Sequence, residues 1–105
     1  MSWVDKIISV HLAVTDQVSH SKRLASDRYF VWQEERAKDF IADGRHQMRA
    51  VIGTTDLFTK LEIDPWKDAF EAALNDAEGI AWRLNSVDFE PDTGFAHYEW
   101  VWQVI

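Results

Sequence analysis

Apolar and polar residues alternate strictly along the last stretch of the chain, and this pattern constrains the fold more than any other feature. Residues 95–104 read FAHYEWVWQV. Because successive side chains of a strand point to opposite faces, one face is apolar and the other polar. The apolar face carries Ala96, Tyr98, Trp100, Trp102 and Val104. The polar face carries His97, Glu99 and Gln103. The pattern predicts a strand with one face in the core and the other in water or at an interface.

Two segments are predicted to be helices. Ser2, with Asp5 three positions later, forms an N-cap pattern, and apolar residues then recur at helical spacing. Asp64 and Pro65 supply an N-cap and a proline at the first helical position, and Gly79 ends this second helix.

Three further segments are rich in aromatic and β-branched residues, which is typical of strands. They are residues 28–34, residues 48–58 and a short strand within 80–89. The first two flank the turn sequence Asp43-Gly44 and are expected to pair antiparallel. Residues 15–27 are polar and are expected to form a long loop. Gly53 lies inside a strand pattern, where it indicates a bulge or a close packing contact.

The order helix, strand, strand, helix, strand, strand predicts an α+β fold. We expect a single domain over residues 1–105, with an antiparallel or mixed sheet of about four strands and two helices packed on it. Six tryptophans fall on these elements. They are expected to fill the core, although a chain of this size has limited room for all of them, and a subunit interface is the alternative for at least one.

The charge balance argues against a nucleic-acid partner. The net charge is −7, and the excess acid lies in the second half: residues 1–50 carry eight Lys/Arg against seven Asp/Glu, and residues 51–105 carry three against eleven. Binding to phosphates requires clustered cations. The one basic stretch, residues 19–28, is interpreted either as a solvated loop or as an arm for an acidic partner. The chain has no cysteine, which suits a reducing cytoplasm, and no apolar run long enough to span a membrane.

No arrangement of residues points to catalysis. The four histidines show no spacing typical of metal ligands, and His97 with Glu99 makes only a two-point site on one strand face. The isolated glycines form no phosphate-binding loop. We therefore expect no catalytic residues, no metal and no cofactor, and interpret the acids Asp88, Glu90 and Asp92 as solvated groups near a turn.

From Tyr29 onward the chain resembles the tail-completion, or tail-terminator, proteins of long-tailed phages and prophages. The resemblance rests on four features in order: the strand YFVWQEE, the turn segment ADGRHQ at 42–47, the strand end DLFTK at 56–60, and the closing helix and strands up to YEWVWQV. Their order and spacing carry the likeness.

This resemblance implies a structural virion protein that forms a ring, commonly of six copies, at the head-proximal end of a tail. It implies three partners: further copies of the chain, the tail tube protein and the head–tail connector protein. It also implies assembly in the host cytoplasm and then a place in the virion tail. Candidate interface residues are Lys22, Arg23, Asp39, Phe40, Arg45, His46, His97 and Glu99. Asp88, Glu90 and Asp92 are candidates to line the lumen of the ring, where they would repel DNA.

Two other functions stay open on the sequence alone. One is a small bacterial dimeric binding module that uses the sheet face as a ligand or protein pocket. The other is an enzyme without a recognisable motif.

Overall fold

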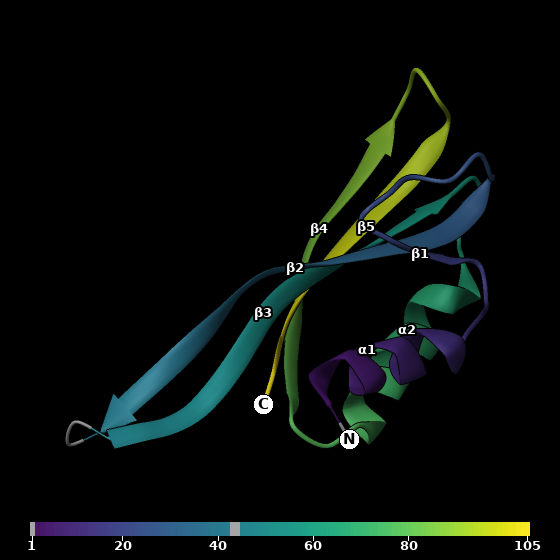
Figure 1. Ribbon diagram of the computed structural model, residues 1–105. Coiled ribbons are helices and arrows are strands. Elements are labelled where there is room, and N and C mark those ends of the chain that lie inside the picture. Colours follow the sequence, from purple (N-terminus) through teal and green to yellow (C-terminus); the bar gives the residue numbers. More distant parts are fainter. Residues whose placement is uncertain (1, 43–44) are drawn as a thin grey trace.

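The protein is an α+β fold with two helices and a five-stranded mixed sheet (Figure 1). The computed structural model describes the backbone of residues 2–42 and 45–105, and the side chains of residues 2–35 and 50–105. The elements are α1 (Trp3–Leu12), β1 (Val18–His20), β2 (Arg28–Ala42), β3 (Arg45–Thr59), α2 (Pro65–Asp76), β4 (Ile80–Glu90) and β5 (Phe95–Val104).

The sheet has the strand order β1-β2-β3-β5-β4 and contains one strand that the sequence does not predict. Strand β1 lies in the segment expected to be a loop, and it pairs parallel to β2, with Val18 opposite Phe30. The other pairings are antiparallel. A strand of three residues is too short to show alternation, which is why the sequence pattern misses it.

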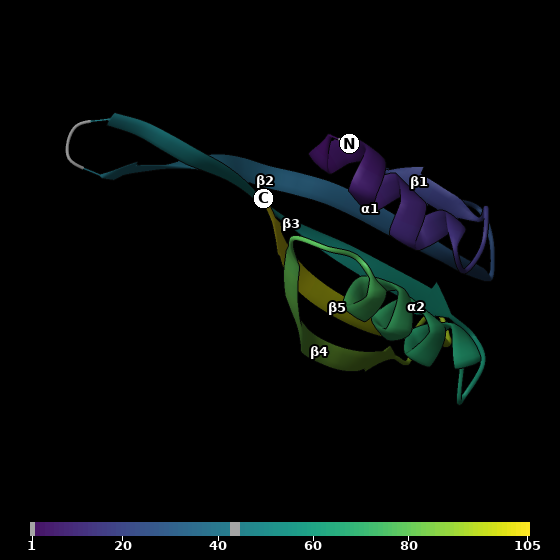
Figure 2. The same ribbon diagram turned by 90° about the horizontal axis from the view of Figure 1, so that it is seen from below.

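Both predicted helices are confirmed, with their caps. The Ser2 side chain accepts a hydrogen bond from the backbone N–H of Asp5, and the Asp64 side chain accepts one from that of Trp66. Gly79, with φ of 78°, follows the second helix in the left-handed conformation that glycine adopts without strain. Both helices lie on the same side of the sheet, which curves around them (Figure 2).

Strand β4 continues to Glu90, which is further than the sequence predicts. The prediction stops early because a β-bulge interrupts the alternation on which it rests. The register shifts between Leu84 and Ser86, so no residue of β5 stands opposite Asn85 in the strand pairing. Beyond the bulge the apolar positions move by one residue, to Val87 and Phe89. The alternation that begins at Ile80 therefore ends at Leu84, although the pairing continues.

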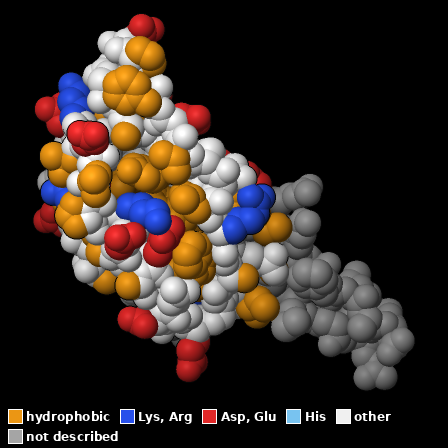
Figure 3. All heavy atoms as spheres, turned by 180° about the vertical axis from the view of Figure 1, so that it is seen from behind, with side chains coloured by type: hydrophobic (Ala, Val, Ile, Leu, Met, Phe, Trp, Pro, Cys, Tyr) orange, Lys and Arg blue, Asp and Glu red, His pale blue; other side chains and the backbone are white. Residues whose placement is uncertain are grey.

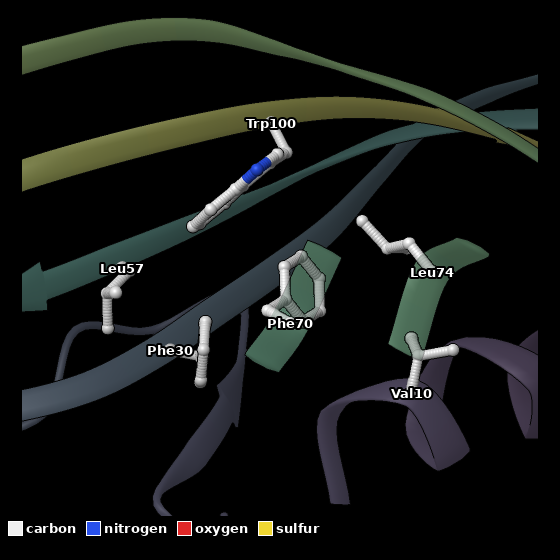
Figure 4. Close-up of a cluster of buried hydrophobic side chains, with 6 residues drawn as sticks. All are labelled: Val10, Phe30, Leu57, Phe70, Leu74 and Trp100. Carbon is white, nitrogen blue, oxygen red and sulfur yellow. The ribbon is translucent and has the colours of Figure 1, made fainter. Parts of the chain in front are cut away.

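The main core lies between the helices and the sheet (Figure 4). Phe70 of α2 lies between Phe30 of β2 and Trp100 of β5, with ring centroids 5.0 Å and 4.9 Å away. The remaining buried members are Val10, Leu57 and Leu74. The predicted apolar face of β5 is confirmed, since Trp100, Trp102 and Val104 are all buried.

A second buried cluster surrounds Trp102, and the buried side chain of His11 is linked to it through Thr55. Trp102 Nε1 donates a 2.9 Å hydrogen bond to Thr55 Oγ1, which lies 2.9 Å from His11 Nε2. The other ring nitrogen of His11, Nδ1, lies 2.6 Å from the carbonyl oxygen of Ile7. Because a carbonyl only accepts, Nδ1 carries the proton, and Nε2 accepts from the Thr55 hydroxyl.

Arg28 and Asp64 join the start of β2 to the start of α2. Arg28 Nε donates a 2.9 Å hydrogen bond to Asp64 Oδ2, and its guanidinium lies 3.7 Å from the centroid of a Trp66 ring. Burial raises the pKa of Asp64, but hydrogen bonds from Arg28 and from the N–H of Trp66 outweigh it, so the pKa lies below its usual value. The carboxylate is thus both a helix cap and the partner of a cation.

Replacing this carboxylate is expected to destabilise the fold at both ends of the contact. Asp64→Ala removes the cap and leaves Arg28 without its anion, at a cost of about 2–3 kcal/mol in the free energy of unfolding. Asp64→Asn is the matched control, because its amide oxygen still accepts from Trp66, and it should cost about half as much. Urea unfolding of the wild type, Asp64→Ala and Asp64→Asn measures both losses in the free energy of unfolding. Equal losses for the two variants would contradict the double role of Asp64 as helix cap and partner of Arg28.

Strands β2 and β3 continue far beyond the rest of the sheet. Their pairing runs to Ala42 opposite Arg45, whereas β5 pairs with β3 only as far as Val51. The hairpin extends to the lower left of Figure 1, away from both helices. It lengthens the molecule to 51 Å, against 24 and 20 Å in the other directions. The radius of gyration is 14.9 Å, where about 13 Å is usual for a compact chain of this size.

Candidate assembly surface

The projecting hairpin is the first candidate surface, and we call residues 36–49 the arm. A bulge between Glu34 and Arg36 marks its start on β2. Strand β1 pairs with β2 only up to Trp32, so the outer backbone edge of the arm on β2 has no partner among the described strands. The outer edge of β3 also has no partner among the described strands over residues 45–50, because β5 pairs with β3 only from Val51 onward. Two-stranded ribbons are marginally stable in water unless another strand or surface packs on them. The arm therefore has the geometry of an element that is completed by a neighbour.

The second candidate surface is an apolar groove at the opposite end of the molecule. We call it the tip groove, because it lies at the joined ends of β4 and β5, beside the segment that leads into α2. It has a volume of about 630 Å³, and its lining includes Leu61, Val87, Phe89, Ala96 and Tyr98. Val87, Phe89 and Tyr98 lie on the sheet face that the helices cover elsewhere. Figure 3 shows hydrophobic side chains from this tip down over the face seen from behind.

Exposure in the tip groove is high for apolar residues. The exposed fractions are 45% for Leu61, 53% for Val87 and 66% for Phe89. Single exposed apolar residues are normal on proteins, but a group of three lining one groove is typical of a binding surface.

The basic stretch expected as a loop or an arm is partly tied to the sheet. Arg23 lies 4.1 Å from the ring centroid of Phe58 and donates from Nε to the hydroxyl of Tyr29 at 3.3 Å. It also pairs with Glu90 at 3.6 Å. Lys22 is exposed beside it. Of the two predicted cations, Arg23 therefore holds the loop against the sheet, and Lys22 points to solvent.

His97 belongs to a cluster of charged groups on the sheet face away from the helices. Its Nε2 lies 2.9 Å from Asp56 Oδ1, and its ring stacks on Phe58 with centroids 4.3 Å apart. The hydrogen bond to Asp56 raises the pKa of His97 above its usual value. The predicted partner Glu99 instead accepts from Asn85 at 2.7 Å. Asp56 is a member that the sequence analysis does not find, because it lies on a different strand.

The three predicted lumen acids lie at the joined ends of β4 and β5. Asp88 is exposed and stands opposite His97 in the register, and Asp92 is exposed in the turn. Glu90 is engaged with Arg23 and with the hydroxyl of Thr93. The structure thus brings Arg23, Glu90 and His97 to one end of the sheet.

The remaining four predicted interface residues lie on the arm. The backbone places Asp39 opposite Arg49, and His46 opposite Ile41, while Phe40 stands at a shift in register and Arg45 at the last pair. Their side chains lie outside the described residues, as does the turn at Asp43 and Gly44.

The described residues hold no group of three or more side chains suited to a metal ion. Within the same ranges, neither helix is long and apolar enough to cross a membrane.

The sequence analysis misses the apolar residues of the tip groove. Val87 and Phe89 alternate, as strand residues do, but the bulge at Asn85 separates their pattern from the one before it. Leu61 lies just before the helix cap, outside any predicted element. The alternation of Val87 and Phe89 is visible in the sequence, but their exposure follows from where α2 begins, which the pattern does not show.

Comparisons with known proteins give a likeness of fold. No family model matches the chain, and no curated protein matches it either. Solved structures do match, among them a chain of the structure described as "Virion of native gene transfer agent (GTA) particle". The two share 11% sequence identity, with a TM-score of 0.59, over 96% of this chain and 88% of that one. The protein therefore has the fold of a subunit found in a virion particle.

Proposed function

We propose that this chain is a structural virion protein that forms a ring at the head-proximal end of a phage tail, where it ends growth of the tail tube and joins tail to head. The arm is the observation that carries the proposal. An element that projects from the body with unpaired backbone edges is suited to contact another subunit.

The fold likeness supports the same proposal. The matching structure is by its own description a virion, and the match spans nearly the whole of this chain. The resemblance to tail-completion proteins from Tyr29 onward narrows the role to the end of a tail. Its partners are then further copies of the chain, the tail tube protein and the head–tail connector.

Ring formation requires two different surfaces on each subunit, because each copy contacts one neighbour through each of them. The arm and the tip groove are such a pair, since they lie at opposite ends of the molecule (Figure 1).

Native mass spectrometry of the purified protein, with and without tubes of the cognate tail tube protein, tests the proposal. We expect a ring, commonly of six copies, or a monomer that forms rings on tubes. Added to polymerising tube protein, the chain should also shorten the tubes. A shortened-arm variant, with residues 40–48 replaced by Asn-Gly between the paired positions Asp39 and Arg49, is expected to fold but not to assemble. A monomer or dimer that is indifferent to tubes contradicts the proposal, and a stable dimer favours a binding module.

A further inference from the structure

We propose that the arm of one copy docks in the tip groove of the next copy, so that successive copies join head to tail. This inference deepens the proposed function, on which it rests, by assigning the two surfaces that make the ring.

The groove is an uncovered continuation of the core. Val87, Phe89 and Tyr98 lie on the sheet face against which the helices pack, but beyond the start of α2. Elsewhere on that face the equivalent residues, such as Leu57 and Trp100, are completely buried. A surface that continues a core in this way favours an apolar occupant over water.

The charges of the two surfaces are opposite. The arm carries four Lys/Arg against two Asp/Glu, a net charge of +2. The charged residues that line the groove are Lys60, Glu62 and Asp88, a net charge of −1, and Asp92 is exposed in the adjoining turn. Of the other acids at this end, Glu90 pairs with Arg23, and Glu99 lies on the opposite face of the sheet. A basic arm and an acidic tip attract each other, whereas two arms or two tips repel, which selects a head-to-tail contact over a symmetric one.

Backbone geometry supports the same occupant. β4 is the last strand of the sheet and pairs only with β5 among the described strands, so its outer edge lies free beside the groove. The arm has free strand edges as well. Each surface therefore has an unpaired strand edge that the other can complete. In this arrangement Asp88 and Asp92 face a neighbouring copy, which is an alternative to the lumen position suggested by the sequence.

Charge variants of exposed residues test the contact. The groove variant combines Val87→Lys with Phe89→Lys, and the arm variant combines Arg45→Glu with Arg49→Glu. Leu12→Lys is the matched control, because Leu12 is 57% exposed on α1, away from the groove. Circular dichroism and thermal unfolding check that each variant is folded. We expect the groove and arm variants each to weaken self-association at least about tenfold, and the control to behave as the wild type.

Mixing distinguishes a head-to-tail contact from a symmetric one. The groove variant keeps an intact arm and the arm variant keeps an intact groove. An equal mixture should therefore give a one-to-one heterodimer by native mass spectrometry, although neither variant assembles alone. If the mixture stays monomeric while the control assembles, the head-to-tail contact is overturned.

Disulfide trapping covers the case of a weak contact, since the chain has no cysteine of its own. Copies with Phe89→Cys and copies with Arg45→Cys, tagged differently, should form the mixed disulfide in preference to either homodimer. Copies with Leu12→Cys, mixed with copies with Arg45→Cys, should not form a mixed disulfide in preference to the homodimers. Trapping without any ring on tail tubes would retain the contact and contradict the proposed function. Rings that form despite the groove variant would retain the function and overturn the contact.

Discussion

Gly53→Ala is expected to destabilise the protein by about 3 kcal/mol or more, a cost at the upper end of those for overpacking a core. A methyl carbon added at Gly53 would lie well inside van der Waals contact with Cη2 of the Trp102 ring and 2.5 Å from the backbone oxygen of Gln33. Gly53 pairs with Trp102 on one side and with Glu34 on the other, so the added atom meets both neighbouring strands.

Neither neighbour has room to move. Trp102 is buried, and its Nε1 is held by Thr55 in the network that includes His11. Gln33 is part of the β2 backbone next to the bulge that begins after Glu34. Relief of the clash requires either the loss of the hydrogen bond from Trp102 or the separation of β2 from β3. Both disturb the base of the arm as well as the core.

Gly94→Ala is the control for this prediction. Gly94 has a φ of 79°, and a methyl group there would meet nothing within 4 Å. Its cost is the backbone strain alone, about 1–2 kcal/mol. Urea unfolding at neutral pH gives both free energies. A loss for Gly53→Ala no larger than that for Gly94→Ala would show that the close packing of Trp102 does not constrain the fold.

The sequence predicts the elements of this fold well where side-chain periodicity or caps define them. Ser2, Asp64 and Pro65 mark the helix starts, and the alternation around Trp100 identifies the last strand. Gly53 in a strand pattern correctly indicates close packing, and the structure adds a bulge on the facing strand. These features are local, so a single sequence is enough to find them.

The features that the sequence does not predict depend on contacts between distant residues. The second half of β2 is charged and shows no alternation, yet it continues as a strand because β3 supplies its hydrogen bonds. Apolar exposure at Phe89 follows from where α2 begins. Burial of His11 follows from the packing of Phe30 and Phe70 on its helix face. A pattern along one segment contains none of this information.

Stability is expected to fall by about 3 kcal/mol as the pH is lowered from neutrality to about 4, because His11 is buried in its neutral form. Burial lowers the pKa of His11 from 6.5 to about 4, and the hydrogen bond to the Ile7 carbonyl offsets only part of this effect. In the unfolded chain the imidazole takes up its proton near pH 6.5. Between these two values the unfolded state binds more protons than the native state, so acid favours unfolding. Each unit of difference in pKa corresponds to about 1.4 kcal/mol.

The other shifted groups act outside most of this pH range. Asp56 raises the pKa of His97, so the stability that His97 contributes is complete below pH 6.5 and is lost only as the pH rises through its folded pKa. The lowered pKa of Glu34, whose first cause is its hydrogen bond with His20, makes stability fall only as the pH drops below the carboxylate's usual 4.5. The slope between pH 6.5 and 4.5 is therefore expected to report His11.

Urea unfolding at several pH values, together with NMR of the imidazole nitrogens, measures this effect. In the wild type, Nδ1 should carry the proton and the ring should not titrate above pH 5. His11→Leu should unfold more easily at neutral pH, since Thr55 loses its acceptor, but its stability should no longer depend on pH between 6.5 and 4.5. His20→Gln, which alters an exposed ring, should keep the wild-type slope. Titration of His11 near 6.5, or an unchanged slope in His11→Leu, would show that another group causes the loss. Because native proteins are stable by only about 5–15 kcal/mol, a network centred on one histidine would set the acid limit of this fold.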